Sequence, residues 1–158
     1  MAVSISQAEA DNEIFRNPDL GIAFYAPEEW DIELVDASDT YVRADVGPAD
    51  KRGFCGIHSF TTDVKSVAEI ADRMTEALAA ELEKDGILQT EIERNNITTA
   101  SGVAGVRVSV LMNDDGWSKR AYFLHKGVAH MVDCETTLRD RDEFKPAFDT
   151  VHSTFDID

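Results

Sequence analysis

Three strand-length segments separated only by short polar turns constrain the fold of this chain more than any other feature. They span residues 103–112, 117–125 and 128–136. Connections this short join antiparallel neighbours, because a parallel crossover needs a dozen residues or more. The second half of the chain therefore predicts a meandering antiparallel β-sheet.

The two turns also predict a strand register. A four-residue turn at 113–116 pairs Met112 with Trp117, and a two-residue turn at 126–127 pairs His125 with Val128. One face of the sheet then collects apolar side chains, which are Val106, Val108, Val110, Phe123, Val128, Val132 and Cys134. The opposite face carries a polar strip, which is Arg107, Ser109, Arg120, Tyr122, Met131 and Asp133. We expect a long helix to pack on the apolar face.

That helix is clearly marked in the sequence. Ser66 followed by Glu69 forms a capping box, and Gly86 after Asp85 is a stop signal. Between these ends an apolar stripe repeats at helical spacing, namely Val67, Ile70, Ala71, Met74, Leu78 and Leu82. Further strands are predicted at 22–25, 32–36, 41–46, 54–61 and 88–94, with a short helical turn from Pro27 to Trp30 and a last helix at 142–151.

Composition and charge narrow the functional classes. The 158 residues suit one domain, which we place at 14–158, and the polar, aperiodic residues 1–13 predict a disordered or frayed terminus. A net charge of -16 repels phosphate backbones and anionic lipids, so we expect neither nucleic acid nor membrane insertion. No segment has the pattern of a signal peptide or membrane helix, which predicts a cytoplasmic protein, although a removed signal peptide or lipoprotein anchor would leave no trace.

Two cysteines, Cys55 and Cys134, lie far apart in apolar strand-like segments. Neither has the spacing of a metal site or a redox motif. We expect buried free thiols, and the alternative is a disulfide between two strands, which would imply an oxidising compartment.

Several motifs together resemble the PsbP-like family. They are the opening "NPDLGIAFYAPEEW", the long amphipathic helix, the aromatic strand segment "RAYFLHKGVAHMVDCE" and a final helix that closes on "HSTFDI". Gly21, Pro27 and Trp30 match the family's opening pattern as structural positions, so no functional residue is carried over with them. The resemblance spans about Phe15 to Ile157 and implies an α+β fold, an α/β/α sandwich around a largely antiparallel, meandering sheet. It also implies action by binding other proteins, and sometimes metal ions, rather than by catalysis.

Two groups of residues are candidate binding sites. Arg107, Arg120, Tyr122 and Asp133 on the polar strip suit a small anion or an acidic peptide, or else an Arg120–Asp133 ion pair between strands. His125 and His130 flank the second turn on one face, where two imidazoles are a candidate divalent metal site without an evident third ligand. The turn Asp114-Asp115-Gly116 lacks the spacing of a calcium loop.

Catalytic motifs are missing from the sequence. It contains no nucleophile elbow and no phosphate-binding glycine loop, and His58 and His152 have no sequence-local nucleophile. We therefore expect a non-enzymatic binding or accessory domain that contacts an unknown protein partner and needs no cofactor. The alternatives are a small-ligand or divalent-metal binding protein and an uncharacterised hydrolase.

Overall fold

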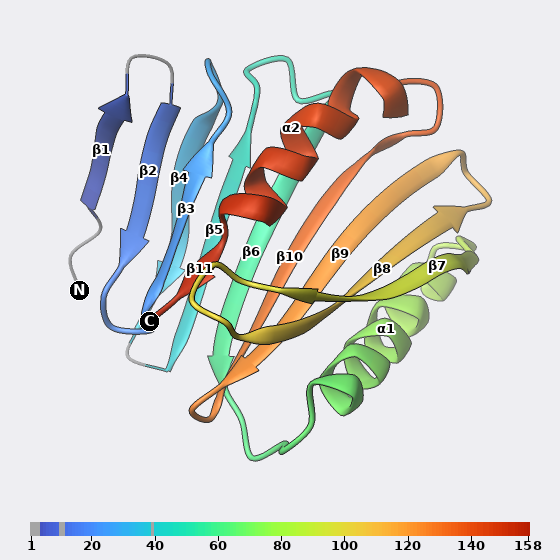
Figure 1. The fold of residues 1–158 in the computed structure, drawn as a ribbon. Helices are drawn as coiled ribbons and strands as arrows, with labels where there is room; N and C mark the ends of the chain where they lie inside the picture. Colours follow the sequence, from blue (N-terminus) through green and yellow to red (C-terminus); the bar gives the residue numbers. More distant parts are fainter. Residues whose placement is uncertain (1–3, 10–11, 39) are drawn as a thin grey trace.

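The computed structural model describes residues 4–9, 12–38 and 40–158 of the chain. These residues form two antiparallel sheets and two helices, so the predicted α+β class is confirmed (Figure 1). No helix within these ranges is long and apolar enough to cross a membrane.

The smaller sheet has the strand order β1-β2-β3-β11. Its strands are β1 (Ser4–Glu9), β2 (Asn12–Asn17), β3 (Ile22–Ala26) and β11 (Asp156–Ile157). The structure corrects the expectation of a frayed terminus at residues 1–13, because β1 pairs with β2 in an antiparallel ladder. Backbone groups make this ladder, and hydrophobic periodicity alone does not reveal it. Residues 1–3, 10 and 11 lie outside the described ranges.

The larger sheet has the strand order β4-β5-β6-β10-β9-β8-β7. Its strands in chain order are β4 (Asp31–Ala37), β5 (Tyr41–Gly47), β6 (Gly53–Thr61), β7 (Gln89–Thr98), β8 (Ala104–Met112), β9 (Gly116–His125) and β10 (Val128–Thr137). The predicted meander corresponds to β8, β9 and β10, which are neighbours in this sheet. All paired strands in the described ranges are antiparallel.

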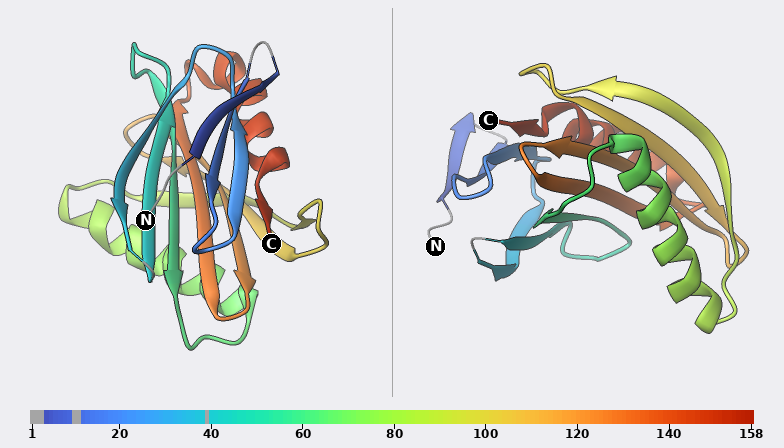
Figure 2. Two further views of the ribbon diagram at one scale, coloured as in Figure 1. Left: turned by 90° about the vertical axis from the view of Figure 1, so that its left-hand side faces the viewer. Right: turned by 90° about the horizontal axis from the view of Figure 1, so that it is seen from below.

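Two helices cover opposite faces of the larger sheet, as an α/β/α sandwich requires (Figure 2). Helix α1 (Val67–Lys84) begins at Ser66, whose hydroxyl accepts a hydrogen bond from the Glu69 N–H at 3.4 Å. It ends before Gly86, which has a φ of +74°. Helix α2 (Arg141–Thr154) lies on the other face together with the smaller sheet. The predicted helix ends are therefore confirmed for α1 and extended by a few residues for α2.

The register of β9 and β10 is as predicted, but that of β8 and β9 differs by one residue. Leu111, not Met112, pairs with Trp117. The connection takes one more residue on the β8 side, and Asp115 within it has a φ of +67°. A slip of one residue moves every β8 side chain to the other face.

The apolar set predicted for one face is consequently divided between the two. Helix α1 packs on Val106, Val108 and Val110 together with side chains of β9 and β10, namely Tyr122, Ala129 and Met131. Phe123, Val132 and Cys134 lie on the opposite face, in the core beneath α2. Trp30 joins that core as expected, but it follows a turn rather than a short helix, and its N–H donates to the Pro27 carbonyl at 3.1 Å.

The two cysteines form a disulfide. Cys134 of β10 pairs directly with Cys55 of β6, and their Cα atoms are 4.0 Å apart. The expectation of free thiols was wrong, because 79 residues separate two positions that the sheet makes adjacent. The alternative of a cross-strand disulfide is the one the structure contains.

Candidate functional site

One half of a sheet face has no helix above it. Helix α1 packs over β8 and β9, whereas β4, β5 and β6 continue the same face beyond it. The side chains that β4–β6 present there are Glu33, Arg43, Asp45, Phe54 and His58, and we call this set the open sheet face. Register places them together, because Asp45 pairs with both Glu33 and Gly56, and Arg43 pairs with His58.

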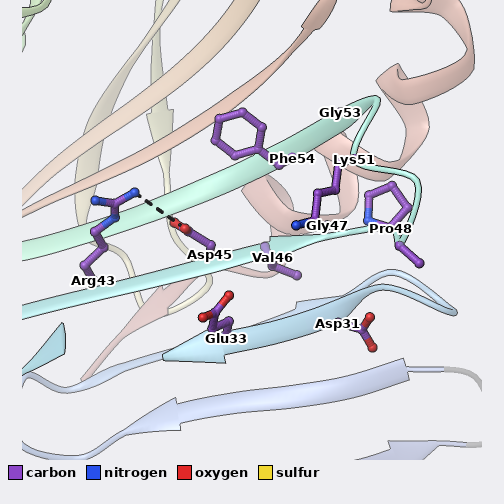
Figure 3. Close-up of a pocket in the computed structure, with 11 residues that line it drawn as sticks. Asp31, Glu33, Arg43, Asp45, Val46, Gly47, Pro48, Lys51, Gly53 and Phe54 are labelled. Carbon is purple, nitrogen blue, oxygen red and sulfur yellow. Dashed lines mark hydrogen bonds and ion pairs between the residues drawn. The ribbon is translucent and has the colours of Figure 1, made fainter. Parts of the chain in front are cut away.

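A hollow of about 400 Å³ lies at the end of this face. Glu33, Arg43 and Asp45 line it together with Phe54 and the loop that joins β5 to β6 (Figure 3). Phe54 is 42% exposed, which is high for an aromatic side chain on a sheet. The hollow therefore combines carboxylates with an accessible aromatic ring.

Gly56 has no side chain, and the space above it is bordered by polar atoms of Asp45 and His58. A Cβ atom built on Gly56 would lie 3.6 Å from Asp45 Oδ1 and 3.5 Å from His58 Nε2. Asp45 Oδ1 is inaccessible to solvent and accepts no hydrogen bond, while Asp45 Oδ2 lies 3.5 Å from the Arg43 guanidinium. The buried oxygen is thus unsatisfied, and the Asp45 side chain, 33% exposed, presents its other oxygen beside Arg43.

Burial shifts the pKa values of two titratable groups on this side of the sheet. Burial, followed by the charge of Arg43, lowers the pKa of His58, so the imidazole is neutral at pH 7. Burial together with the charge of Asp133 raises the pKa of Glu135 to about 7. Glu135 pairs with Phe54, and Asp133 pairs with Gly56, so both carboxyl groups border the open sheet face on β10.

The polar strip predicted from the sequence does not form one site. Arg120 pairs with Asp133 as expected, with Arg120 Nε 3.6 Å from Asp133 Oδ1. Both are buried on the α1 side with Tyr122, and burial raises the pKa of the Tyr122 hydroxyl. Arg107 pairs with Ala121 and therefore lies on the opposite face of the sheet. The one-residue register difference separates Arg107 from the other three.

Arg120 has a structural environment. Its Nε donates to Ser118 Oγ at 3.0 Å, and its Nη1 donates to Gln89 Oε1 at 3.0 Å. Ser118 Oγ in turn donates to Asp133 Oδ1 at 2.6 Å. With Arg120 only 1% exposed, this network joins β9, β10 and β7 beneath α1 rather than facing a ligand.

The two histidines proposed as metal ligands differ in environment. His130 is buried, its Nδ1 lies 2.7 Å from Ser59 Oγ, and its ring packs against Phe155. Burial, and then the charge of His125, lowers the pKa of His130 to about 4. His125 is half-buried at the end of β9. Within residues 4–9, 12–38 and 40–158 there is no group of three His, Cys, Asp or Glu that could hold a metal ion.

The remaining two histidines lie in different environments. His58 Nδ1 lies 3.4 Å from the Tyr41 hydroxyl. His152 is buried in α2, and burial lowers its pKa to about 3. Ser59 and His130 have the separation of a nucleophile and base, but both are buried in the core, where no substrate reaches them.

Comparison with solved structures identifies the fold. The solution structure of cyanobacterial PsbP (CyanoP) from Synechocystis sp. PCC 6803 matches with a TM-score of 0.75 over 98% of each chain, at 15% sequence identity. This chain has the PsbP-like fold. A protein of unknown function from Pseudomonas aeruginosa also matches, at 15% identity and a TM-score of 0.43, over 88% of this chain and 92% of that one. No protein-family model and no curated protein matches the chain.

Sequence reasoning missed the open sheet face of this PsbP-like fold. Phe54 follows a polar loop and alternates with Gly56 and His58, which indicates one side of a strand. That pattern does not show whether a helix covers the side. Phe54 is exposed because α1 packs on β8 and β9 and does not cover this residue of β6, and that position of the helix results from tertiary packing.

Proposed function

We propose that this protein is a non-enzymatic binding domain that docks a basic segment of another protein on its open sheet face. The observation that carries the proposal is the hollow beside the exposed ring of Phe54, which three carboxylates line, namely Asp31, Glu33 and Asp45. A lysine or arginine side chain supplies donors for these carboxylates and a cation that stacks on an aromatic ring. The PsbP-like resemblance, which implies binding rather than catalysis, supports the same proposal.

Charge favours a basic partner over an acidic one. Carboxylates at Asp31, Glu33 and Asp45 line the hollow, against Arg43 and Lys51. Asp133 on β10 is already paired with Arg120, and Glu135, with a pKa of about 7, is only partly ionised, so the carboxylates that line the hollow carry the local charge. The chain as a whole carries -16. Electrostatic attraction of this kind raises the rate of association and disfavours acidic partners.

A basic peptide and two pairs of matched variants test the proposal. The probe is a mixed-sequence peptide rich in lysine and arginine, titrated into isotopically labelled protein at physiological salt. Asp45→Asn and Phe54→Ser should each weaken binding several-fold, and shifts in the NMR spectrum should concentrate on β4–β6. The controls Glu83→Gln, an exposed carboxylate on α1, and Leu138→Ser, 40% exposed, should leave affinity unchanged.

Two outcomes would contradict the proposal. Equal weakening by Asp45→Asn and Glu83→Gln would mean that the peptide responds only to net charge. Turnover of a substrate in a broad activity screen, lost on substitution of one residue, would instead make the protein an enzyme.

The disulfide changes the compartment that we propose. Disulfides persist in oxidising compartments and are rare in the cytosol. We therefore propose that the protein functions in an oxidising compartment rather than in the cytoplasm. Because both cysteines are fully buried, cells are quenched in acid and the protein is alkylated after denaturation. Cys55 and Cys134 should then react only after reduction, and reaction before reduction would restore the cytoplasmic assignment.

A further inference from the structure

A second hollow, of about 390 Å³, lies on the opposite face of the larger sheet, beside the first turn of α2. Four of its lining residues are basic, namely Arg107, Lys119, Arg141 and Lys145. We call this set the basic hollow. The chain has only 15 lysine and arginine residues against 31 acidic ones, so four of them in one hollow is a concentrated positive region.

Separate elements bring these four side chains together. Lys119 on β9 pairs with Ser109 on β8, and Arg107 lies two residues from Ser109 on the same side of β8. Arg141 and Lys145 are one helical turn apart at the start of α2. The hollow therefore exists only in the folded chain, with donors on two of its sides.

Acidic side chains neutralise only part of this charge. Asp149 accepts from Lys119 Nζ at 2.8 Å and from Lys145 Nζ at 2.9 Å. Asp142 lies 3.7 Å from Arg141, and Glu93 lines the far wall. Arg107 has no ion pair among the described residues, and its Nε is inaccessible to solvent and donates no hydrogen bond. Such an unsatisfied guanidinium donor requires an acceptor.

The amino end of α2 also favours an anion in the basic hollow. Asp140, the residue before α2, makes no side-chain capping hydrogen bond. The amino end of a helix carries a partial positive charge, which favours anions nearby. Lys119 is only 10% exposed, so its ammonium group is held at the hollow rather than free in solvent.

We propose that the basic hollow binds the phosphoryl group of a small organic phosphate monoester. Arginine presents planar donors that match phosphate oxygens. The four cations exceed the three nearby carboxylates, Glu93, Asp142 and Asp149, by one positive charge, so the surroundings favour an anion. Ile92, which is exposed, and Trp117 line the rest of the hollow and suit the organic part. The volume falls within the roughly 300–1,000 Å³ typical of small-molecule sites.

Titration of phenyl phosphate by NMR or calorimetry at pH 8 tests this proposal. Phenyl sulfate, which has a similar shape and one charge fewer, is the ligand control. Phenyl phosphate should bind saturably, and phenyl sulfate about tenfold more weakly. Arg141→Gln and Arg107→Gln should each weaken phenyl phosphate binding about tenfold, whereas Arg139→Gln, at a residue 86% exposed and outside the hollow, should have no effect.

Two results would contradict phosphate binding at the basic hollow. Lack of saturation in the unmodified protein, or equal losses in Arg139→Gln and Arg141→Gln, would overturn the proposal. Arg141 is 44% exposed, so its variant should fold even if Arg107→Gln proves unstable, and melting temperatures check this. Asp45→Asn should leave phosphate binding intact, because the open sheet face lies on the other side of the sheet.

Discussion

Arg120 and Glu135 show two ways in which this chain accommodates charge away from solvent. Arg120 is buried, but Ser118 and Gln89 accept its hydrogen bonds and Asp133 lies near its Nε. A buried ion that keeps its partners is tolerated, whereas removal of one partner leaves an uncompensated charge. Glu135 instead is largely buried beside Asp133, and burial, followed by the charge of Asp133, raises the pKa of its carboxyl group.

Glu135 predicts a specific dependence of stability on pH. Its pKa rises from 4.5 to about 7 on folding, so the folded state holds the proton more tightly than the unfolded state. The stabilisation from this group is present below pH 4.5 and is lost as pH rises through about 7. Glu135→Gln should therefore raise the melting temperature by a few degrees at pH 8 and by little at pH 4.5.

Thermal unfolding at both pH values measures this difference. Glu83→Gln is the control, because that carboxylate is exposed on α1 and should show no such contrast. An equal effect of Glu135→Gln at the two pH values would show that folding does not raise the pKa of Glu135.

For helices and strands, sequence patterns predicted the features that depend on single residues or short turns. The α1 ends followed from Ser66 and Gly86, because a cap and a positive φ are properties of single residues. The β9–β10 register followed from a two-residue turn. The β8–β9 register failed because Asp115 adopts a positive φ that its residue type permits but does not require.

The candidate sites depended on this register more than the fold did. A slip of one residue moved Arg107 away from Arg120 and towards Lys119 and α2. Lys145 belongs to a helix that the sequence predicted at 142–151, and Arg141 is the residue by which that helix begins earlier. The position of this helix against β3, β6, β9 and β10 results from tertiary packing. The sequence therefore predicted basic residues on the meander, but it did not predict which face of the sheet brings Arg107 and Lys119 together.

The disulfide between β6 and β10 should stabilise the folded protein. It joins strands whose cysteines are 79 residues apart in sequence, so it restricts the unfolded chain strongly. Reduction should lower the free energy of unfolding by about 2–4 kcal/mol in urea denaturation. The Cys55→Ala/Cys134→Ala variant should show a comparable loss and no further response to reductant. Two thiols that titrate in denatured, unreduced protein would show that the bond is absent.

At the scale of the whole molecule, charge is distributed unevenly between the two faces of the larger sheet. The hollow on the open sheet face has one more acidic than basic side chain, whereas the basic hollow lies on the α2 side. The two proposed sites thus have opposite charge and separate positions. One protein could hold a basic partner and an anionic ligand at once.

The net charge of -16 predicts that salt stabilises the fold. With 31 acidic and 15 basic residues, repulsive pairs outnumber attractive ones, and compaction brings the repulsive pairs closer. Screening lengths fall from about 30 Å at 0.01 M to about 10 Å at 0.1 M salt. The melting temperature should therefore rise by several degrees across this range at pH 7.5 and level off above it.

The choice of cation is the control for this prediction. Sodium chloride and choline chloride should raise the melting temperature equally at equal ionic strength, because screening depends on charge alone. A flat response would mean that surface ion pairs such as Arg52–Asp50 offset the repulsion, and a larger effect of sodium would indicate a specific cation site.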